Sequence, residues 1–92
     1  MKSRTTDRFW ECYNKLPESI RQQAKEAYSL FLNNPYHPSL QFKRVHSVQP
    51  IFSARITKDY RAIGITQGDE IIWFWIGSHS DYDKLLKKLK NA

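Results

Sequence analysis

The feature that most constrains the fold is an uninterrupted run of six apolar residues, Ile71 to Ile76, in the C-terminal third of the chain. Successive side chains of a strand point to opposite faces of a sheet, so a run that is apolar at every position predicts a strand covered on both faces. A buried helical segment can give the same short run, but the β-branched and aromatic content and the Gly68-Asp69 turn signal before it favour a strand. We therefore expect this run to form the central strand of a sheet.

Polar and ionisable residues follow this strand directly, in the segment from Gly77 to Tyr82. His79, Asp81 and Tyr82 in this segment carry side chains that can exchange or share protons. Because a stiff strand holds the groups at its end in fixed positions, this segment is the first candidate for a functional site.

The 92-residue chain is long enough for one modest hydrophobic core, which predicts a single domain over residues 1–92. Cys12 is the only cysteine, which excludes an internal disulfide and a cysteine-rich zinc site and indicates a reducing compartment. No apolar run approaches the roughly 20 residues of a membrane span, and the segment Met1 to Thr6 is polar and basic. We expect a cytoplasmic protein without a membrane partner.

Charge points to anionic partners, because 15 Lys and Arg residues against nine Asp and Glu residues give a formal charge of +6. A positive field over so small a surface attracts nucleic acid, an acidic protein, or both. Many small basic proteins bind nothing of the kind, so the positions of the charges are more informative than their sum.

Two amphipathic helices are expected before the first strand. Thr6 and Asp7 can cap a helix that starts near Arg8 and ends before Pro17. A second helix follows, whose apolar stripe consists of Ile20, Ala24, Ala27, Tyr28 and Phe31. Together they predict a helical hairpin that packs on a sheet.

The rest of the chain predicts an antiparallel sheet and a final helix. Strands are expected at residues 40–46, 52–57 and 60–66, before the apolar strand at 71–76. Short turns separate the last three strands, which predicts a meander. Residues 81–91 place leucines on one side and lysines around the other, which predicts a short basic amphipathic helix.

Residues from three neighbouring segments can form a site that cleaves RNA. Arg55 and Arg61 flank a short turn, and if their strands pair antiparallel the two guanidiniums project from one rim of the sheet and can hold a phosphate. The next strand brings His79, Asp81 and Tyr82 toward the same sheet. Cleavage of RNA needs a base, an acid and cations to balance the charge at phosphorus, and this set contains all three.

These residues also have purely structural interpretations. Arg61 can pair with Asp59 or Asp81 on the surface, and Tyr82 can pack under the final helix. His79 is the least easily explained by structure, because an imidazole in a polar turn beside a carboxylate is suited to proton transfer. The three histidines lack zinc-ligand spacing, so we expect no metal and no other cofactor.

Four motifs in a fixed order add a family resemblance. They are His37-Pro38-Ser39-Leu40, Phe52-Ser53-Ala54-Arg55-Ile56, Asp59-Tyr60-Arg61-Ala62-Ile63 and Ile76-Gly77-Ser78-His79. With the helical hairpin before them they resemble the RelE/ParE superfamily of bacterial toxins from type II toxin–antitoxin modules, over nearly the whole chain. The resemblance implies an α+β fold, with an N-terminal helical hairpin on an antiparallel sheet of about four strands and a short C-terminal helix.

The same resemblance implies a ribosome-dependent mRNA endoribonuclease that uses no metal. Arg55 matches a basic strand position of the family, Arg61 matches the arginine of a Tyr-Arg strand start, and His79 falls where the family often carries arginine or histidine. In this interpretation the arginines hold the scissile phosphate, and His79 acts as general acid or base. Asp81 orients His79, and Tyr82, whose spacing departs from the commonest pattern, assists or stacks.

The implied partners are an antitoxin, the ribosome and mRNA. Five basic residues are expected to attract RNA of any sequence: Lys43, Arg44, Lys84, Lys87 and Lys88. The segment Lys2 to Thr6 poorly matches the apolar first strand of many members, so that strand is expected to be missing or short and to leave an edge or groove for an acidic antitoxin segment. The alternatives are a ParE-like inhibitor of DNA gyrase, which uses the fold as a binding surface, and an inactive relative that binds only an antitoxin.

Overall fold

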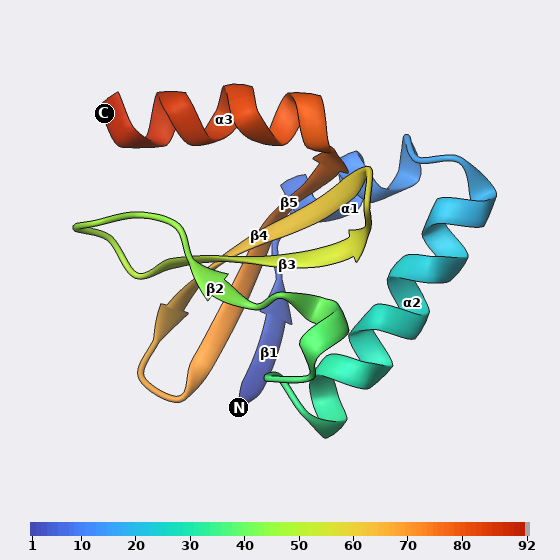
Figure 1. Cartoon of the computed structure of the whole chain (residues 1–92), viewed down its shortest axis with the longest axis horizontal. Coiled ribbons are helices and arrows are strands. Elements are labelled where there is room, and N and C mark those ends of the chain that lie inside the picture. The colour runs from blue at the N-terminus through green and yellow to red at the C-terminus, as the bar shows by residue number, and fades with distance from the viewer. Residues whose placement is uncertain (92) are drawn as a thin grey trace.

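A five-stranded sheet with helices on both faces forms the body of the protein in the computed structural model, which describes residues 1–91 (Figure 1). The elements are β1 (Lys2–Thr5), α1 (Asp7–Asn14), α2 (Glu18–Asn33), the 3₁₀ helix η1 (Pro38–Leu40), β2 (Lys43–Arg44), β3 (Ile51–Thr57), β4 (Tyr60–Gln67), β5 (Glu70–Ser78) and α3 (His79–Asn91). Ala92, the last residue of the expected domain, lies outside the described residues. The expected α+β architecture is confirmed, with five strands in place of about four. No helix in residues 1–91 is long and apolar enough to cross a bilayer.

The strand order in the sheet is β1-β5-β4-β3-β2. The expected meander is confirmed, because β3, β4 and β5 pair antiparallel in sequence order. The short first strand is also present: β1 pairs parallel to β5 along four residues, from Lys2 opposite Glu70 to Thr5 opposite Trp73. The apolar strand β5 is therefore interior, but the expectation that it is central is wrong, since β4 occupies the middle of the sheet.

A β-bulge lets β5 bury side chains on both faces. Ile63 of β4 lies opposite Trp75, whereas the next residue, Gly64, lies opposite Trp73, so Phe74 is an extra residue on β5. The bulge reverses the alternation, and Trp73 joins the core under α1 and α2 while Trp75 joins the core under α3. The continuous apolar run thus serves two cores, as the sequence predicted for a strand covered on both sides.

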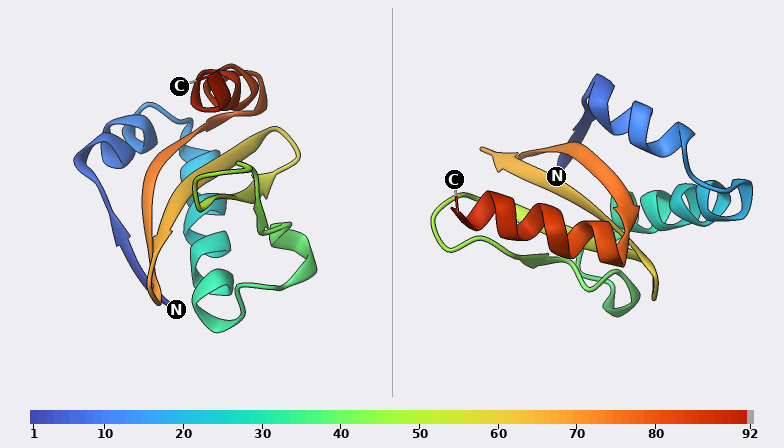
Figure 2. Two further views of the ribbon diagram at one scale, coloured as in Figure 1. Left: turned by 90° about the vertical axis from the view of Figure 1, so that its left-hand side faces the viewer. Right: turned by 90° about the horizontal axis from the view of Figure 1, so that it is seen from above.

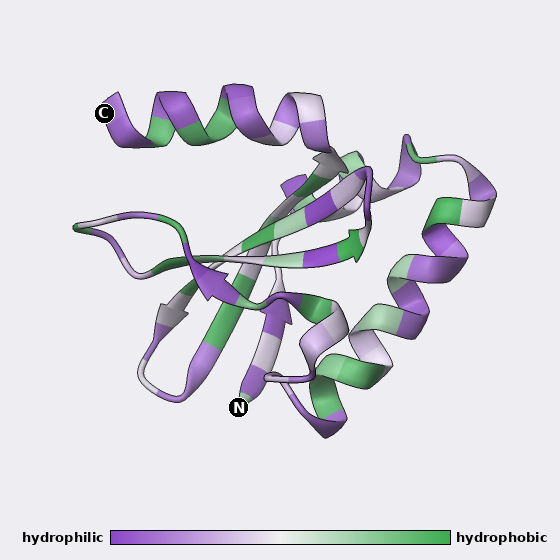
Figure 3. Cartoon of the chain, in the orientation of Figure 1, coloured by the Kyte–Doolittle hydropathy of each residue, from purple (hydrophilic) through white to green (hydrophobic). Residues whose placement is uncertain are grey.

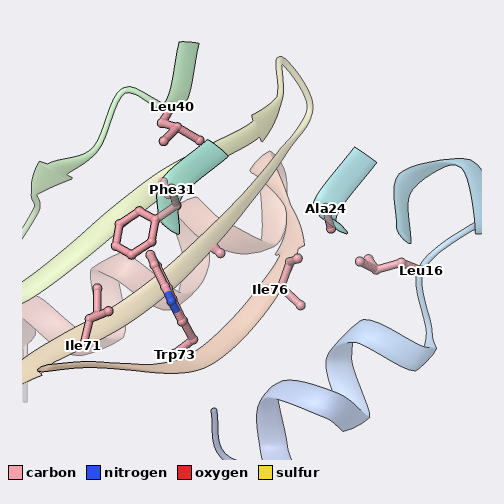
Figure 4. Close-up of a cluster of buried hydrophobic side chains, with 9 residues drawn as sticks. Leu16, Ala24, Phe31, Leu40, Ile71, Trp73 and Ile76 are labelled. Atoms are coloured by element: carbon pink, nitrogen blue, oxygen red, sulfur yellow. The ribbon is translucent and has the colours of Figure 1, made fainter. Parts of the chain in front are cut away.

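The larger core lies between the sheet and the first two helices. Its labelled members in Figure 4 are Leu16, Ala24, Phe31, Leu40, Ile71, Trp73 and Ile76. Phe31 of α2 meets Trp73 edge to face, with ring centroids 5.3 Å apart. Contact between α2 and β5 through these two rings fixes the helix over the sheet.

The two N-terminal helices cover different parts of this face. The predicted cap of α1 is confirmed, since the Thr6 hydroxyl accepts a hydrogen bond from the backbone N–H of Phe9 at 3.2 Å. α1 packs on β5 and α2 packs on β3 (Figure 2). Tyr28, a member of the predicted apolar stripe of α2, is 41% exposed because it borders a cleft between the two helices.

The strand expected at residues 40–46 is reduced to the two residues of β2. Leu40 ends the turn η1 and is buried in the core, so it does not continue an extended chain. Gln41 adopts a left-handed backbone with φ of 44°, which interrupts any strand at that point. The signal for a strand was correct only at Lys43 and Arg44.

The final helix starts two residues earlier than expected, at His79. The backbone N–H of His79 donates to the Asp59 carbonyl at 2.7 Å, and the N–H of Asp81 donates to the Ser78 hydroxyl at 3.2 Å. These bonds satisfy two donors of the first turn and attach the start of α3 to the β3–β4 turn. The apolar side of α3, which includes Leu85, Leu86 and Leu89, packs over the second core. Hydrophilic and hydrophobic residues alternate along the helix (Figure 3), and its lysines are exposed.

Candidate active site

The two arginines of the predicted site lie directly opposite each other on neighbouring strands. Arg55 of β3 pairs in register with Arg61 of β4. Directly opposite residues of an antiparallel pair project from the same face, and like charges in that position repel. Ile63, two residues after Arg61 on β4, packs in the core under α3, so both arginines project toward that side of the sheet. The expected placement of two cations on one face is thus present.

Ser53 of β3 and Gln41, in the short connection between η1 and β2, hold the guanidinium of Arg61. Its Nε and Nη2 donate to the Ser53 hydroxyl at 3.2 and 3.0 Å. Its Nη1 donates to Oε1 of Gln41 at 3.2 Å, and Nη2 donates to the Gln41 carbonyl at 3.4 Å. Arg61 is only 5% exposed, so these contacts fix its planar group in one orientation.

No carboxylate neutralises this cation within residues 1–91. The ion pairs in that part of the chain are Arg4–Glu70 and His79–Asp83, so the surface pairing of Arg61 with Asp59 or Asp81 is wrong. A guanidinium has five N–H groups, and the four bonds above leave one on Nη1, which either the neighbouring Tyr82 hydroxyl or an incoming anion can accept. A buried cation without a counterion, with a second cation opposite, is an environment that favours an anion.

The surroundings of Arg61 act on its pKa in opposite directions. Burial lowers the pKa below the usual arginine value, and the positive charge of Arg55 lowers it further, while neighbouring Tyr82 raises it. Arginine starts from a value so high that Arg61 remains a cation at neutral pH. The site therefore keeps its positive charge under cellular conditions.

Tyr82 connects the arginine to His79. The Cζ atom of Arg61 lies 5.4 Å from the centre of the Tyr82 ring, within the range of a cation–π contact. The His79 ring lies edge to face with the same tyrosine, with centroids 5.4 Å apart. Because β5 runs into α3 without a loop, His79 and Tyr82 stand one turn apart on a helix that begins where the strand ends. Three of the predicted site residues therefore meet at one place.

The carboxylate beside His79 is that of Asp83. Nδ1 of His79 lies 3.3 Å from Oδ2 of Asp83, one helical turn later. Asp81, expected to orient His79, uses its backbone N–H in the helix cap and makes no ion pair within the described chain. About half of the His79 side chain is exposed, so the imidazole is accessible from solvent.

The predicted RNA-binding residues occupy different environments. Lys43 is exposed and pairs with Ser53 across β2 and β3, which places it on the same face as the two arginines. Arg44 instead donates to the carbonyls of His46 at 3.0 Å and Val48 at 3.1 Å, and so shapes the loop after β2. Three further lysines are exposed on α3: Lys84, Lys87 and Lys88.

Sequence reasoning missed three residues of this site, Gln41, Ser53 and Asp83. Ser53 carried a usable signal, since it lies two residues before Arg55 and therefore on the same face of the strand. Asp83 would follow from placing the helix start at His79, because it is then four residues further along the same helix face. Gln41 had no local signal, because its contact depends on a left-handed backbone and on a partner 20 residues away.

A cleft of about 670 Å³ opens on the opposite side of the sheet, between α1 and α2. Its walls include six aromatic residues: Phe9, Trp10, Tyr13, Tyr28, Phe31 and Trp73. Arg4 of β1 and Lys25 of α2 also border it, and they give the apolar cleft a basic margin. An apolar surface of this kind typically receives another protein segment.

Comparison with known proteins identifies the family of this chain. A family model described as the ParE-like toxin domain matches residues 18–84. A search of curated proteins by sequence found no match. Among solved structures, the RelB-RelE antitoxin–toxin complex from Methanococcus jannaschii is similar with a TM-score of 0.71 and 20% identity, over 88% of this chain and 96% of that chain.

Two further structures share the fold at low sequence identity. YafQ from Escherichia coli BL21(DE3) has a TM-score of 0.71 and 13% identity, over 88% of this chain and 96% of its own. The YoeB/ParE toxin from Agrobacterium tumefaciens has a TM-score of 0.66 and 15% identity, over 86% of this chain and 99% of its own. At these identities the likeness concerns the fold, and the chemistry has to be argued from the site.

Proposed function

This chain belongs to the ParE-like toxin domain family of the RelE/ParE superfamily, and on that premise we propose that it is a toxin that cleaves mRNA on the ribosome. The observation that carries the proposal is the buried guanidinium of Arg61, which has Arg55 opposite it and no carboxylate partner within residues 1–91. A site built this way is suited to a phosphate.

Phosphate binding relieves an unfavourable arrangement of charges. Two like charges in register across a strand pair repel each other, and burial of Arg61 removes part of its hydration. A phosphate oxygen can accept the remaining Nη1 N–H and sit between the two cations. Negative charge builds up on the non-bridging phosphoryl oxygens as the 2′-oxygen attacks, so prearranged cations stabilise the transition state more than the bound substrate.

His79 supplies the proton transfer in this proposal. In the reaction the RNA 2′-oxygen forms a bond to phosphorus and loses its proton, while the bond to the 5′-oxygen breaks and that oxygen gains a proton. His79 performs one of these transfers, Asp83 orients the imidazole, and Tyr82 holds both His79 and Arg61 against its ring. Asp81 is left a structural role in the helix cap.

Attraction to RNA of any sequence is assigned to lysines around this site. Lys43 shares the face of the two arginines, and the α3 lysines project into solvent from the helix that carries His79. Arg44 contributes through the shape of its loop. The ribosome and mRNA are cytoplasmic, so the proposal places the toxin in the cytoplasm.

An antitoxin is the proposed occupant of the cleft between α1 and α2. The cleft is apolar with the basic residues Arg4 and Lys25 at its border, which matches an amphipathic helix with acidic flanks. The formal charge of +6 favours the same acidic partner. Because this cleft and the arginines lie on opposite faces of the sheet, an antitoxin that also blocks the site has to wrap around the sheet.

Inhibition of DNA gyrase is the second candidate function, and the match to a ParE-like family model favours it. In that case the fold acts as a binding surface and His79 has no proton to transfer. The two candidates differ in what happens to mRNA after the toxin is induced.

Primer extension on cellular mRNA, soon after induction in a bacterium, separates the candidates. We expect cuts within translated codons that disappear in a His79→Ala variant and persist in an Asp81→Asn control. Intact mRNA together with arrested growth and loss of gyrase supercoiling activity would establish the gyrase function instead. Intact mRNA with normal growth would identify an inactive relative.

A further inference from the structure

His46, in the loop between β2 and β3, connects that loop to the far end of α3. Its Nε2 lies 3.0 Å from the carbonyl oxygen of Leu89. Its Nδ1 accepts hydrogen bonds from the backbone N–H groups of Val48 at 3.1 Å and Gln49 at 2.8 Å. Figure 1 shows this loop beneath the C-terminal part of α3, far from the helix start at the end of β5.

These contacts determine the form of the imidazole. Nδ1 accepts from two N–H groups, so it carries the lone pair and the ring proton is on Nε2. Nε2 therefore donates to the Leu89 carbonyl. Carbonyls in the last turn of a helix have no donor within the helix, so His46 satisfies a group that otherwise needs water.

We propose that His46 is a positioning residue that fastens the C-terminal end of α3 and thereby keeps Tyr82 over Arg61. At its start α3 is held by the bond from His79 to the Asp59 carbonyl. Between the two ends Tyr82 is the only buried residue of α3 among residues 79–91, and the leucines of the helix are only half-buried. A polar attachment at the far end then limits the angle at which the helix crosses the sheet.

The consequence for catalysis rests on the proposed function, whereas the attachment itself does not. A helix fixed at both ends holds the Tyr82 ring 5.4 Å from Arg61 and His79 beside the same ring. If one end is released, the helix can move, and the distances from the Tyr82 ring to Arg61 and His79 then vary over a wider range. The same displacement alters the signal of the Arg61 guanidinium whether or not the protein cleaves RNA.

Two substitutions separate the two functions of the imidazole. In His46→Asn the side-chain oxygen can replace Nδ1 as the acceptor for the loop, but no donor reaches Leu89. In His46→Gln the side-chain amide can replace Nε2 as the donor to Leu89. His37→Asn is the matched control, because Nδ1 of His37 also accepts a backbone N–H two residues later, from Ser39, and the ring has no bond to α3.

The test is nuclear magnetic resonance on the purified chain without RNA, with amide exchange of α3 and the Nε–H resonance of Arg61 as readouts. In His46→Asn we expect exchange in the last turns of α3 to rise about three- to tenfold, the change expected for loss of one neutral hydrogen bond. The Arg61 Nε–H resonance should move as the ring current of Tyr82 changes. His37→Asn and His46→Gln should leave both readouts near those of the parent chain.

Identical exchange and an unmoved Arg61 resonance in His46→Asn and His37→Asn would overturn the proposal. Faster exchange at the end of α3 with an unmoved Arg61 resonance would also overturn it, because His46 would then act only locally. Faster exchange of sheet amides in His46→Asn would mean that this variant disturbs the whole fold, and His46→Gln is then the deciding variant. His46→Gln keeps the donor to Leu89, so loss of amide protection in α3 of that variant would contradict the proposal. None of these outcomes depends on cleavage of RNA, so they are independent of the test of the proposed function.

Discussion

At the scale of single residues, the buried cation of Arg61 lowers the stability of the fold. It is buried, its pKa is lowered by burial, and Arg55 lies opposite it. Such a group contributes little to stability compared with an apolar side chain of similar volume. The proposed function accounts for its retention, because a phosphate would supply the missing negative charge.

Replacement of Arg61 by methionine should therefore separate stability from activity. We expect the free energy of unfolding to change by less than about 1 kcal/mol in either direction, because loss of the cation offsets the unpaired Ser53 and Gln41 groups. RNA cleavage should fall by about a hundredfold or more. Urea unfolding and single-turnover cleavage measure the two effects. Large destabilisation with residual activity would show that Arg61 is structural.

The two carboxylates near His79 should differ in effect. Asp83→Asn removes the charge beside Nδ1, and because the pair is exposed we expect cleavage to fall only about two- to fivefold. Asp81→Asn should leave the rate unchanged, since Asp81 acts in the cap through its backbone N–H. The rates of the two variants, measured side by side, check this assignment. A greater loss in Asp81→Asn would restore Asp81 as the orienting group.

At the scale of elements, the strand pair β4–β5 needs glycine at two positions, because a tryptophan side chain lies directly over the backbone at each of them. A Cβ on Gly77 would lie 2.6 Å from Cζ2 of Trp75, and one on Gly64 would lie 2.9 Å from Cε3 of Trp73. The tryptophan rings thus cover glycine backbone on the two faces of the sheet. The bulge at Phe74 is what directs the two rings to opposite faces.

Gly77→Ala should lower the free energy of unfolding by about 1–3 kcal/mol, because the Trp75 ring has to move. Gly68→Asn is the control: that site has open space and a left-handed backbone with φ of 64°, which asparagine tolerates. Chemical denaturation of both variants measures the difference. Equal stability of the two variants would show that the ring adjusts without cost.

Elements with local signals could be predicted from the sequence. The cap at Thr6, the meander and the arginine pair all follow from patterns within a few residues. Local pattern did not predict β1, because residues 2–5 lack an apolar pattern and become a strand only through pairing with β5. The bulge at Phe74 and the contact of Gln41 with Arg61 depend on long-range packing, so neither could be inferred from local periodicity.

At the scale of the whole molecule, the sheet separates two surfaces of different chemistry. One carries Arg55, Arg61 and the lysine-bearing helix α3, and the other carries the apolar cleft between α1 and α2. A basic surface and an apolar cleft thus lie on opposite faces of one small sheet and share no residues.

Salt dependence should distinguish these surfaces. We expect the affinity of the His79→Ala variant for single-stranded RNA to fall as the salt concentration rises. In a plot of the logarithm of the binding constant against the logarithm of the salt concentration, each phosphate contact should contribute about −0.7 to the slope. Replacement of Lys84, Lys87 and Lys88 by alanine should reduce that slope by about 2. Lys25→Ala, on the cleft side, is the control and should leave the slope unchanged. An equal change in both variants would indicate that RNA attraction is not localised to α3.

The most direct test of the central claim, that this site cleaves RNA through the 2′-hydroxyl, uses purified chain and ribosomes that carry a defined mRNA. One mRNA is unmodified, and the other has a single 2′-deoxy nucleotide at the cut position. We predict cleavage of the first, with a 2′,3′-cyclic or 3′-phosphate end, and no cleavage of the second. Cleavage of both at the same rate, or of neither, would contradict the mechanism built on Arg55, Arg61 and His79.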